Sequence, residues 1–356
     1  MADNIKKYKI SDIRNGMIVG RDILFGDNIA LSAGVQLNDN LISSIEFLGV
    51  DEVYIIEKAA NNKITNTINP KNIQPLFLDG YSKNLKKIKN AFKNIHYLKQ
   101  VSAIEMFDLT KSNILPLINT SGAINHLQLL GEQDEYSLEH SLNVAIICGV
   151  LGKWLGYKNR ELEQLILAGL LHDVGKIELP KELINKKNKL TTKEVNIMRL
   201  HTEIGGRLLK NSSDIPDNIL SGVLQHHERM DGSGYPHHLK GNDIHPFAKI
   251  IAVADVYDAL SSDCLYKRKA NPFDLLETIH DDLFNKLDST VCSVFMNHVK
   301  DYFNENIVEL SNGKTAEVVK MGHFLNSRPM VKTNNGTFID LEKEKNIKIV
   351  KLIEVM

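Results

Sequence analysis

The hydrophobic pattern divides the chain into a β-prone start, a long helical middle and a β-prone end. Within the first 58 residues, Gly16–Gly20 and Val53–Ile56 are short β-prone runs beside glycines or acidic turns, and Leu41–Leu48 has the pattern of a short helix. Residues 59–73 are polar and rich in Asn, which is typical of a linker. We therefore expect a small β-rich accessory unit at 1–58, followed by a linker.

The middle of the chain carries helical periodicity. Apolar residues at spacings of three and four define one face of an amphipathic helix: Leu85, Ile88, Phe92 and Ile95. Lysines cover its other sides: Lys83, Lys86, Lys87, Lys89, Lys93 and Lys99. They form either a solvated face or a surface for an anionic partner, and nothing else in the sequence supports the partner. We expect a helical connector at 74–130 and a larger helical domain at 131–304.

The last part of the chain is β-prone again. Asn312–Gly313 and Asn335–Gly336 are hairpin-type turn signals, and Ile347–Val355 partly alternates like a half-buried strand. A small β-rich extension is therefore expected at 305–356. The predicted fold class is mainly α, with small β-rich units at both ends.

Composition and charge exclude several classes of protein. The 356 residues hold 43 Lys and Arg against 44 Asp and Glu, so a net charge of −1 offers no overall field for polymeric nucleic acid. No apolar run approaches the ~20 residues of a membrane span, and residues 1–8 lack the apolar stretch of a signal peptide. Cys148, Cys264 and Cys292 are scattered and odd in number, which favours reduced thiols in a cytoplasmic protein.

Histidines cluster in the helical domain, where eight of the 13 lie between His140 and His245. His140 points inward, because it shares a helix face with three apolar residues: Val144, Ile147 and Leu151. A lone inward histidine is more often a hydrogen-bonded core residue than a ligand. The pair His172–Asp173 closes the next apolar helix, and Gly175 is suited to the cap at its C-terminal end.

A further histidine and a buried carboxylate follow. His201 lies on a helix expected to begin at Thr191, because Thr191 and Glu194 have capping-box spacing. Asp255 stands inside an apolar helix, where a carboxylate is costly unless it is paired or bound to metal. Asp258, one turn later, either orients a ligand histidine, caps the helix or faces solvent.

The segment from His226 to Pro236 places two adjacent histidines beside a Gly-Ser-Gly-Tyr-Pro loop. Together the candidates number five histidines and two aspartates on successive inward helix faces, more than one zinc ion needs. Mixed imidazole and carboxylate ligands suit iron or manganese as well as zinc. Two metals bridged by an aspartate form a clamp for attack on a phosphodiester. The sequence therefore indicates metal-assisted hydrolysis.

The order of these residues resembles the HD-GYP domain of the HD phosphohydrolase superfamily: His140, His172–Asp173, His201, His226–His227, Gly234–Tyr235–Pro236 and Asp255. Leu171–Pro180 looks like the family's helix-ending block, and His226–Pro236 looks like its namesake loop. The match spans about half the chain, roughly Glu132 to Asn304. The flanking β-rich pieces are similar to accessory units seen beside such domains.

The resemblance implies an all-helical HD-type catalytic domain at 131–304 that hydrolyses cyclic di-GMP to linear pGpG, to GMP, or to both. The implied metal ligands are His140, His172, Asp173, His201, His226, His227 and Asp255, for two divalent ions such as iron or manganese. Asp173 is implied to bridge the metals. Lys176 matches a catalytic lysine that contacts the scissile phosphate. The nucleotide site is implied to be lined by Gly234, Tyr235 and Pro236.

Two positions depart from the family's pattern. Some members hold a third metal with a Glu one turn before the first histidine, where this chain has Tyr136 beside Glu135; we therefore expect two metals, with a third left open. Where the family usually has a later Arg, this chain has Cys264, which cannot clamp a phosphate through two hydrogen bonds. Lys267 remains as a matching substrate contact, and either affinity is weaker or another residue such as Arg268 compensates.

Alternatives to the hydrolysis of cyclic di-GMP remain open at this stage. Cys264 motivates a metal-bearing receptor that binds cyclic di-GMP with little turnover. Another alternative retains the chemistry but changes the substrate to a different cyclic dinucleotide. The resemblance also suggests a homodimer that forms through the helices before the catalytic domain, because such helices often pair in the family.

Overall fold

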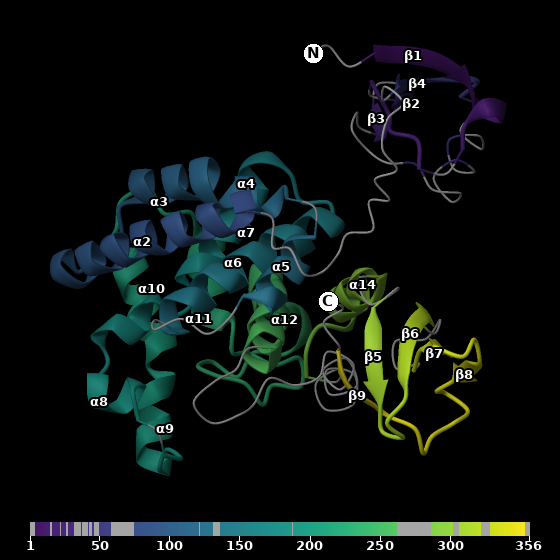
Figure 1. Cartoon of the computed structure of the whole chain (residues 1–356). Coiled ribbons are helices and arrows are strands. Elements are labelled where there is room, and N and C mark those ends of the chain that lie inside the picture. Colours follow the sequence, from purple (N-terminus) through teal and green to yellow (C-terminus); the bar gives the residue numbers. More distant parts are fainter. Residues whose placement is uncertain are drawn as a thin grey trace. The chain divides into compact units, whose positions relative to one another are not determined.

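The computed structural model describes 4–57, 75–120, 122–130, 136–186, 188–261, 286–301, 306–321 and 328–352, with gaps in the first range at 15, 22, 26–27, 32–36, 38–41, 43–44 and 46–49. The chain forms two compact units, Met1–Ile68 and Asn69–Met356 (Figure 1). The linker predicted at 59–73 and most of the helix predicted at Leu41–Leu48 lie outside the described residues. The predicted domain boundaries stay predictions.

The first unit is a small β structure with its own apolar core. Its elements are β1 (Asn4–Lys9), η1 (Ile10–Asp12), β2 (Ile23–Phe25), β3 (Asn28–Leu31) and β4 (Glu52–Glu57), with β1 antiparallel to β4 and β2 antiparallel to β3. The buried core comprises Ile13, Val19, Ile23, Leu37, Ile45, Val53 and Ile55. Within the β-prone run Gly16–Gly20, Ile18 and Val19 lie in isolated bridges rather than in a strand, and Val19 pairs with Ile55.

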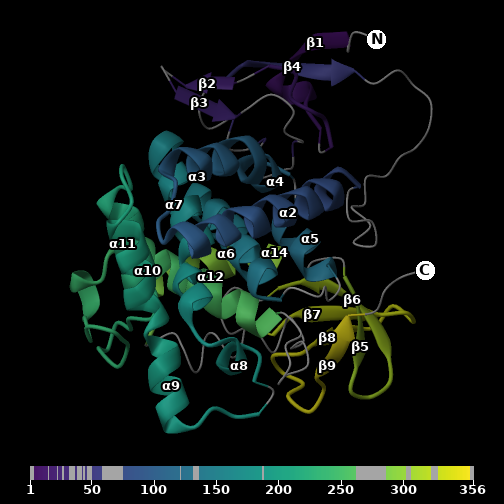
Figure 2. The ribbon, with the colours of Figure 1, turned by 90° about the vertical axis from the view of Figure 1, so that its left-hand side faces the viewer.

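The second unit is built mainly from helices (Figure 2). The first helices are α2 (Pro75–Leu98), α3 (Ala103–Leu109), the π-helical turn η2 (Thr110–Ile114), α4 (Leu115–Ile118) and α5 (Ala123–Leu129). The next are α6 (Tyr136–Trp154), α7 (Asn159–Leu171), η3 (Val174–Glu178), α8 (Lys181–Ile184), α9 (Thr192–Arg199), α10 (His201–Lys210), α11 (Asp217–Gln225), η4 (Gly241–Asp243), α12 (Pro246–Ser261) and α14 (Ser289–Asp301). The predicted mainly α fold class is confirmed.

The centre of this unit is a core between α6, α7, α11 and α12. Helices α6 and α12 are apolar on almost every side and are buried, as expected of helices that lack one polar face. Gly169 of α7 lets α6 approach, because a Cβ there would lie 3.0 Å from the Cys148 sulfur and 3.3 Å from the Ala145 Cα. These close contacts fix the positions of the polar residues that the helices carry inward.

The helix predicted to begin at Thr191 and to carry His201 is in fact two helices. Thr191 is the N-cap of α9 and forms the predicted capping box with Glu194. However, α9 ends at Arg199 and buries no side chain, whereas α10 buries His201, Gly205 and Leu208. His201 is therefore the first residue of a new helix, next to a chain bend at Leu200.

The C-terminal region forms a five-stranded antiparallel sheet in the order β8-β7-β6-β5-β9. Its strands are β5 (Ile307–Leu310), β6 (Thr315–Lys320), β7 (Met330–Thr333), β8 (Phe338–Asp340) and β9 (Ile349–Leu352). The predicted turns join β5 to β6 and β7 to β8, with Gly313 at φ 78° and Gly336 at φ 83°. Across the described residues, no helix is both long and apolar enough to span a bilayer.

Candidate metal centre

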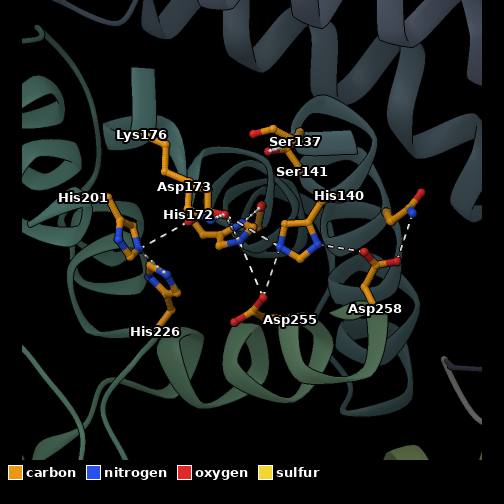
Figure 3. A network of polar contacts seen from close by, with 12 residues as sticks. Ser137, His140, Ser141, His172, Asp173, Lys176, His201, His226, Asp255 and Asp258 are labelled. Atoms are coloured by element: carbon orange, nitrogen blue, oxygen red, sulfur yellow. Dashed lines mark hydrogen bonds and ion pairs between the residues drawn. The ribbon is translucent and has the colours of Figure 1, made fainter. Parts of the chain in front are cut away.

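The seven side chains that the sequence predicts as metal ligands come together in the second unit. Figure 3 labels all of them except His227. They come from α6, the end of α7, the start of α10, the end of α11 and the middle of α12. Their donor atoms fall into two groups, each within 4.8 Å: Asp173, His201, His226 and His227 in one, His140, His172 and Asp255 in the other. All are buried except His227 and Asp255, which are partly exposed.

Three of the histidine rings are held in a single tautomer by the main chain. The Nδ1 of His172 donates to the Gly169 carbonyl at 2.8 Å, that of His201 to Met198 at 2.7 Å, and that of His226 to Val223 at 2.7 Å. A carbonyl oxygen only accepts, so each Nδ1 carries a proton. In a neutral ring the Nε2 then carries no proton and offers a lone pair. The Nε2 atoms of all three rings point into the cluster.

These lone pairs face other acceptors across short distances. The Nε2 atoms of His201 and His226 lie 3.3 Å apart, and His201 Nε2 lies 3.3 Å from Asp173 Oδ1. Among the described residues, His172 Nε2 and Asp173 Oδ1 are buried without any hydrogen-bond partner. Buried acceptors that face each other cost free energy unless a cation lies among them. The donor set therefore fits a divalent metal ion with nitrogen and oxygen ligands.

Both aspartates reach toward the two groups at once. Asp173 Oδ1 faces His201, whereas Asp173 Oδ2 lies 3.3 Å from His172 Nε2 and 3.7 Å from His140 Nε2. Asp255 Oδ1 lies 3.1 Å from His140 Nε2, and its Oδ2 lies 4.0 Å from His227 Nδ1. A carboxylate whose two oxygens face different donor groups is suited to bind one cation with each oxygen.

The charges in the cluster follow from burial and from neighbouring groups. Burial lowers the pKa of His201 and His226, and it lowers the pKa of His227 to about 3, so these rings are neutral near pH 7. Burial alone would raise the pKa of Asp173, but Lys176 and His172 hold it well below its usual value. His201, His226 and His227 thus present neutral imidazoles, and Asp173 presents an ionised carboxylate; these are the states in which such groups bind metals.

His140 is oriented by Asp258, which settles the alternatives that the sequence left open for that aspartate. Asp258 is 2% exposed and accepts from His140 Nδ1 at 2.7 Å. It neither caps the helix nor faces solvent. Burial lowers the pKa of His140, but hydrogen bonds to Asp255 and Asp258 raise it to about 10. The Nε2 of His140 is directed at Asp255, on the cluster side of the ring (Figure 3).

Gly175 has a different role from the predicted C-terminal cap. It lies inside η3, and a Cβ at this position would stand 2.0 Å from the His201 carbonyl oxygen and 2.6 Å from the Gly205 nitrogen. The missing side chain lets η3 touch α10. This contact brings Asp173 and Lys176 beside His201, and Lys176 donates to Asp173 Oδ2 at 2.5 Å.

The Gly-Tyr-Pro loop lies against the cluster. Tyr235 stacks on the His227 ring at 4.7 Å between centroids, and its amide donates to the His227 carbonyl. Gly234 permits this fold, because a Cβ there would lie 2.4 Å from the Arg229 nitrogen. The buried carboxylate of Glu228 accepts from the amides of His237 and Leu239, which ties down the segment after Pro236.

Several predicted residues lie outside the described part of the chain. They are Glu135, Cys264, Lys267 and Arg268, and the side chain of Tyr136 is likewise not described. The sequence did not single out Arg199, whose exposed guanidinium lies 4.9 Å from the Tyr235 ring centroid. It also missed Asn143, although a polar residue three positions after His140 on a buried helix was a usable signal.

Comparison with known proteins places this region in a family. The HD domain family profile matches residues 123–291. The fold resembles that of an HDG"Y"P protein from Bdellovibrio bacteriovorus, with a TM-score of 0.54 at 15% identity, over 83% of this chain and all of that one.

Three curated relatives show closer similarity in sequence. A cyclic di-GMP phosphodiesterase of Pseudomonas aeruginosa is 30% identical over 65% of this chain and 56% of its own length. A cyclic di-GMP phosphodiesterase of Borreliella burgdorferi is 28% identical over 60% of this chain and 57% of its own length. A 3'3'-cGAMP-specific phosphodiesterase of Vibrio cholerae is 32% identical over 50% of this chain and 41% of its own length. The chain thus spans a little more than half the length of the first two relatives and less than half of the third. Residues 123–291 of the helical region thus match the HD domain family, and the fold agrees with that match.

Proposed function

We propose that the seven clustered side chains hold two divalent metal ions, iron or manganese. Asp173, His201, His226 and His227 would serve one ion, and His140, His172 and Asp255 the other. The support is the set of opposed lone pairs at 3.3 Å, which a metal ion placed among them would relieve. Asp173 would bridge, because its two oxygens face different groups. Seven ligands suffice for two ions, and a third ion remains open because Glu135 lies outside the described residues.

We propose further that the protein hydrolyses cyclic di-GMP to pGpG, to GMP, or to both. The observation that carries this proposal is the two-group cluster beside an intact Gly-Tyr-Pro loop, in an HD-GYP domain whose curated relatives include cyclic di-GMP phosphodiesterases. When bound, the metals would supply Lewis-acid activation of water and of the phosphodiester.

The protein's own residues would position the substrate and balance charge. Burial lowers the pKa of Lys176, but Asp173 more than offsets this and raises it, so the ammonium is retained. Lys176 is partly exposed beside the cluster and would stabilise negative charge on the scissile phosphate. The aromatic ring of Tyr235 and the guanidinium of Arg199 would meet the nucleotide, together with Gly234 and Pro236. Lys267 is proposed as a further phosphate contact.

A turnover assay tests this function. The full chain, loaded anaerobically with Fe²⁺ or Mn²⁺, is incubated with cyclic di-GMP, and pGpG and GMP are separated by chromatography. Wild type and a His298→Ala control, which alters an exposed histidine of α14, should form product. His172→Ala should form almost none. Equal product from wild type and His172→Ala, or none from wild type with either metal, would refute the proposal.

A second candidate substrate is 3'3'-cGAMP. The Vibrio cholerae relatives specific for that dinucleotide motivate it. Assaying both dinucleotides in parallel discriminates, because the preferred substrate has the higher kcat/KM. If calorimetry shows tight binding of cyclic di-GMP and the assay shows no product, the result would instead support a metal-bearing receptor that binds cyclic di-GMP with little turnover.

We also infer a homodimer through the helices before the catalytic domain. Large apolar side chains are exposed where α2 ends and α3 begins: Tyr97 at 80%, Leu98 at 64% and Ile104 at 85%. Such exposure in neighbouring residues is typical of a contact surface. Sedimentation of the full chain decides between monomer and dimer.

A further inference from the structure

A chain of buried hydrogen bonds leads from helix α2 to the candidate metal centre. The Tyr81 hydroxyl donates to Asn143 Oδ1 at 2.7 Å, and Asn143 Nδ2 donates to Asp258 Oδ1 at 2.9 Å. The other oxygen of Asp258 accepts from His140 Nδ1 at 2.7 Å. These bonds join α2, α6 and α12. The exposed fractions of Tyr81, Asn143 and Asp258 are 2%, 9% and 2%.

The direction of every bond is fixed by chemistry. An ionised Asp258 can only accept, so the group of Asn143 that faces it must be the amide nitrogen. The amide oxygen then faces Tyr81, whose hydroxyl must donate. The second Asp258 oxygen accepts a hydrogen bond from His140 Nδ1–H, which leaves the Nε2 of the neutral ring as the metal-binding atom. Each residue therefore determines the orientation of the next.

Tyr81 is well placed to anchor this chain. Its ring stacks on Phe77 one turn earlier in α2, at 6.1 Å between centroids. Tyr81 and Phe77 both belong to the buried core that includes α6 and α12. The position of the Tyr81 hydroxyl is therefore set by α2, which carries none of the proposed metal ligands.

We propose that Tyr81 and Asn143 are positioning residues that hold Asp258, and through it His140, in the orientation and tautomer required to bind metal. The inference rests on the proposed metal centre and adds a residue of the connector helix to it. It makes the position of α2 a determinant of metal affinity at the His140 group.

A purely structural role for these residues makes a different prediction. Any buried hydroxyl stabilises the fold, so its loss lowers stability without acting on a particular ligand. A positioning role requires that loss of the Tyr81 hydroxyl weakens metal binding, and that the effect passes through Asn143. A double-mutant cycle separates the two roles, because it measures the coupling between two side chains.

The experiment measures Mn²⁺ binding to the full chain by the electron paramagnetic resonance signal of free Mn²⁺. The variants are Tyr81→Phe, Asn143→Leu, their combination and Asp258→Asn. Tyr81→Phe keeps the ring and its packing and removes only the hydroxyl. Thr110→Val is the matched control, since it removes a buried hydroxyl that donates to the Met106 carbonyl, outside the chain of bonds.

We expect Asp258→Asn to weaken the affected site about 10- to 100-fold and Tyr81→Phe to weaken it at least about threefold. In the Asn143→Leu background, Tyr81→Phe should change affinity less than about 1.5-fold. Thr110→Val should bind like wild type. Wild-type affinity in Tyr81→Phe, or equal effects in both backgrounds, overturns the inference. Absence of Mn²⁺ binding by wild type would instead overturn the proposed metal centre itself.

Discussion

At the scale of single residues, the centre depends on where protons are held. Main-chain carbonyls hold the Nδ1 protons of His172, His201 and His226, and Asp258 holds that of His140. Every Nε2 of these rings is thereby directed into the cluster. Histidines with this arrangement need little reorganisation to bind a metal.

Lys176 provides the most direct residue-level test of catalysis. Lys176→Met should lower kcat about 10²- to 10³-fold, because one positioned donor to a developing charge has an effect of that order. Metal content should stay at the wild-type level, because lysine is not a proposed ligand. Steady-state kinetics with cyclic di-GMP, together with metal analysis, measures both quantities.

Lys249→Met is the matched control for that variant, since Lys249 pairs with Asp288 at 3.4 Å, outside the cluster. It should change kcat less than about threefold. A Lys176→Met enzyme with normal kcat would show that Lys176 serves only to pair with Asp173.

Gly175→Ala tests the close contact between η3 and α10. Its Cβ would meet main-chain atoms, which cannot move aside as a side-chain end does. We expect the free energy of unfolding to fall by about 3 kcal/mol, measured by urea denaturation. Gly206→Ala, on α10, would meet only side-chain atoms of Leu224 and Leu220, the nearest at 3.3 Å, and should change stability by less than about 1 kcal/mol. Equal effects of the two substitutions would contradict this account.

The residues of the cluster could be anticipated from sequence, but the way they are held could not. Five histidines and two aspartates on inward helix faces carried a recognisable signal. Tyr81 gave none, because it lies 62 residues before Asn143 and resembles any aromatic core residue. Gly175 was misassigned since its close neighbour, His201, is remote in sequence. Contacts between distant segments decided both cases.

At the scale of elements, helix ends supply much of the site. His172 and His226 follow the last residues of α7 and α11, and His201 begins α10. Periodicity located these helices, and the Thr191–Glu194 spacing correctly predicted an N-cap. The break at Leu200 was not predictable, because its backbone stays in the helical region of φ and ψ and no Gly or Pro marks it.

The cap of α9 gives a pH-dependent prediction. Hydrogen bonds from Lys186 and Thr191 lower the pKa of Glu194 to about 2, from 4.5 in an unfolded chain. Its contribution to stability is therefore present above pH 4.5 and is lost as the pH falls through 2. Glu194→Gln should have a lower Tm than wild type at pH 6, and the difference should shrink between about pH 4.5 and 2. Thermal melts across this range test it; a constant difference would contradict the assigned pKa.

At the scale of the whole molecule, every candidate ligand belongs to the second compact unit, Asn69–Met356. The mainly α fold followed from the long helical pattern, and the terminal β regions followed from turn signals. The sequence could not show that the C-terminal sheet shares one apolar core with the helices, because burial depends on packing. Substrate preference is likewise a property of the assembled site, and the curated relatives include phosphodiesterases named for cyclic di-GMP and for 3'3'-cGAMP.

The central claim is that this cluster holds two metal ions. The most direct measurement is the metal content per chain of anaerobically purified full-length protein, by mass spectrometry of the elements. We predict about two equivalents of iron or manganese for wild type and less than about half an equivalent for Asp173→Ala, which lacks the proposed bridge. A wild-type protein that holds no more metal than Asp173→Ala would contradict the account.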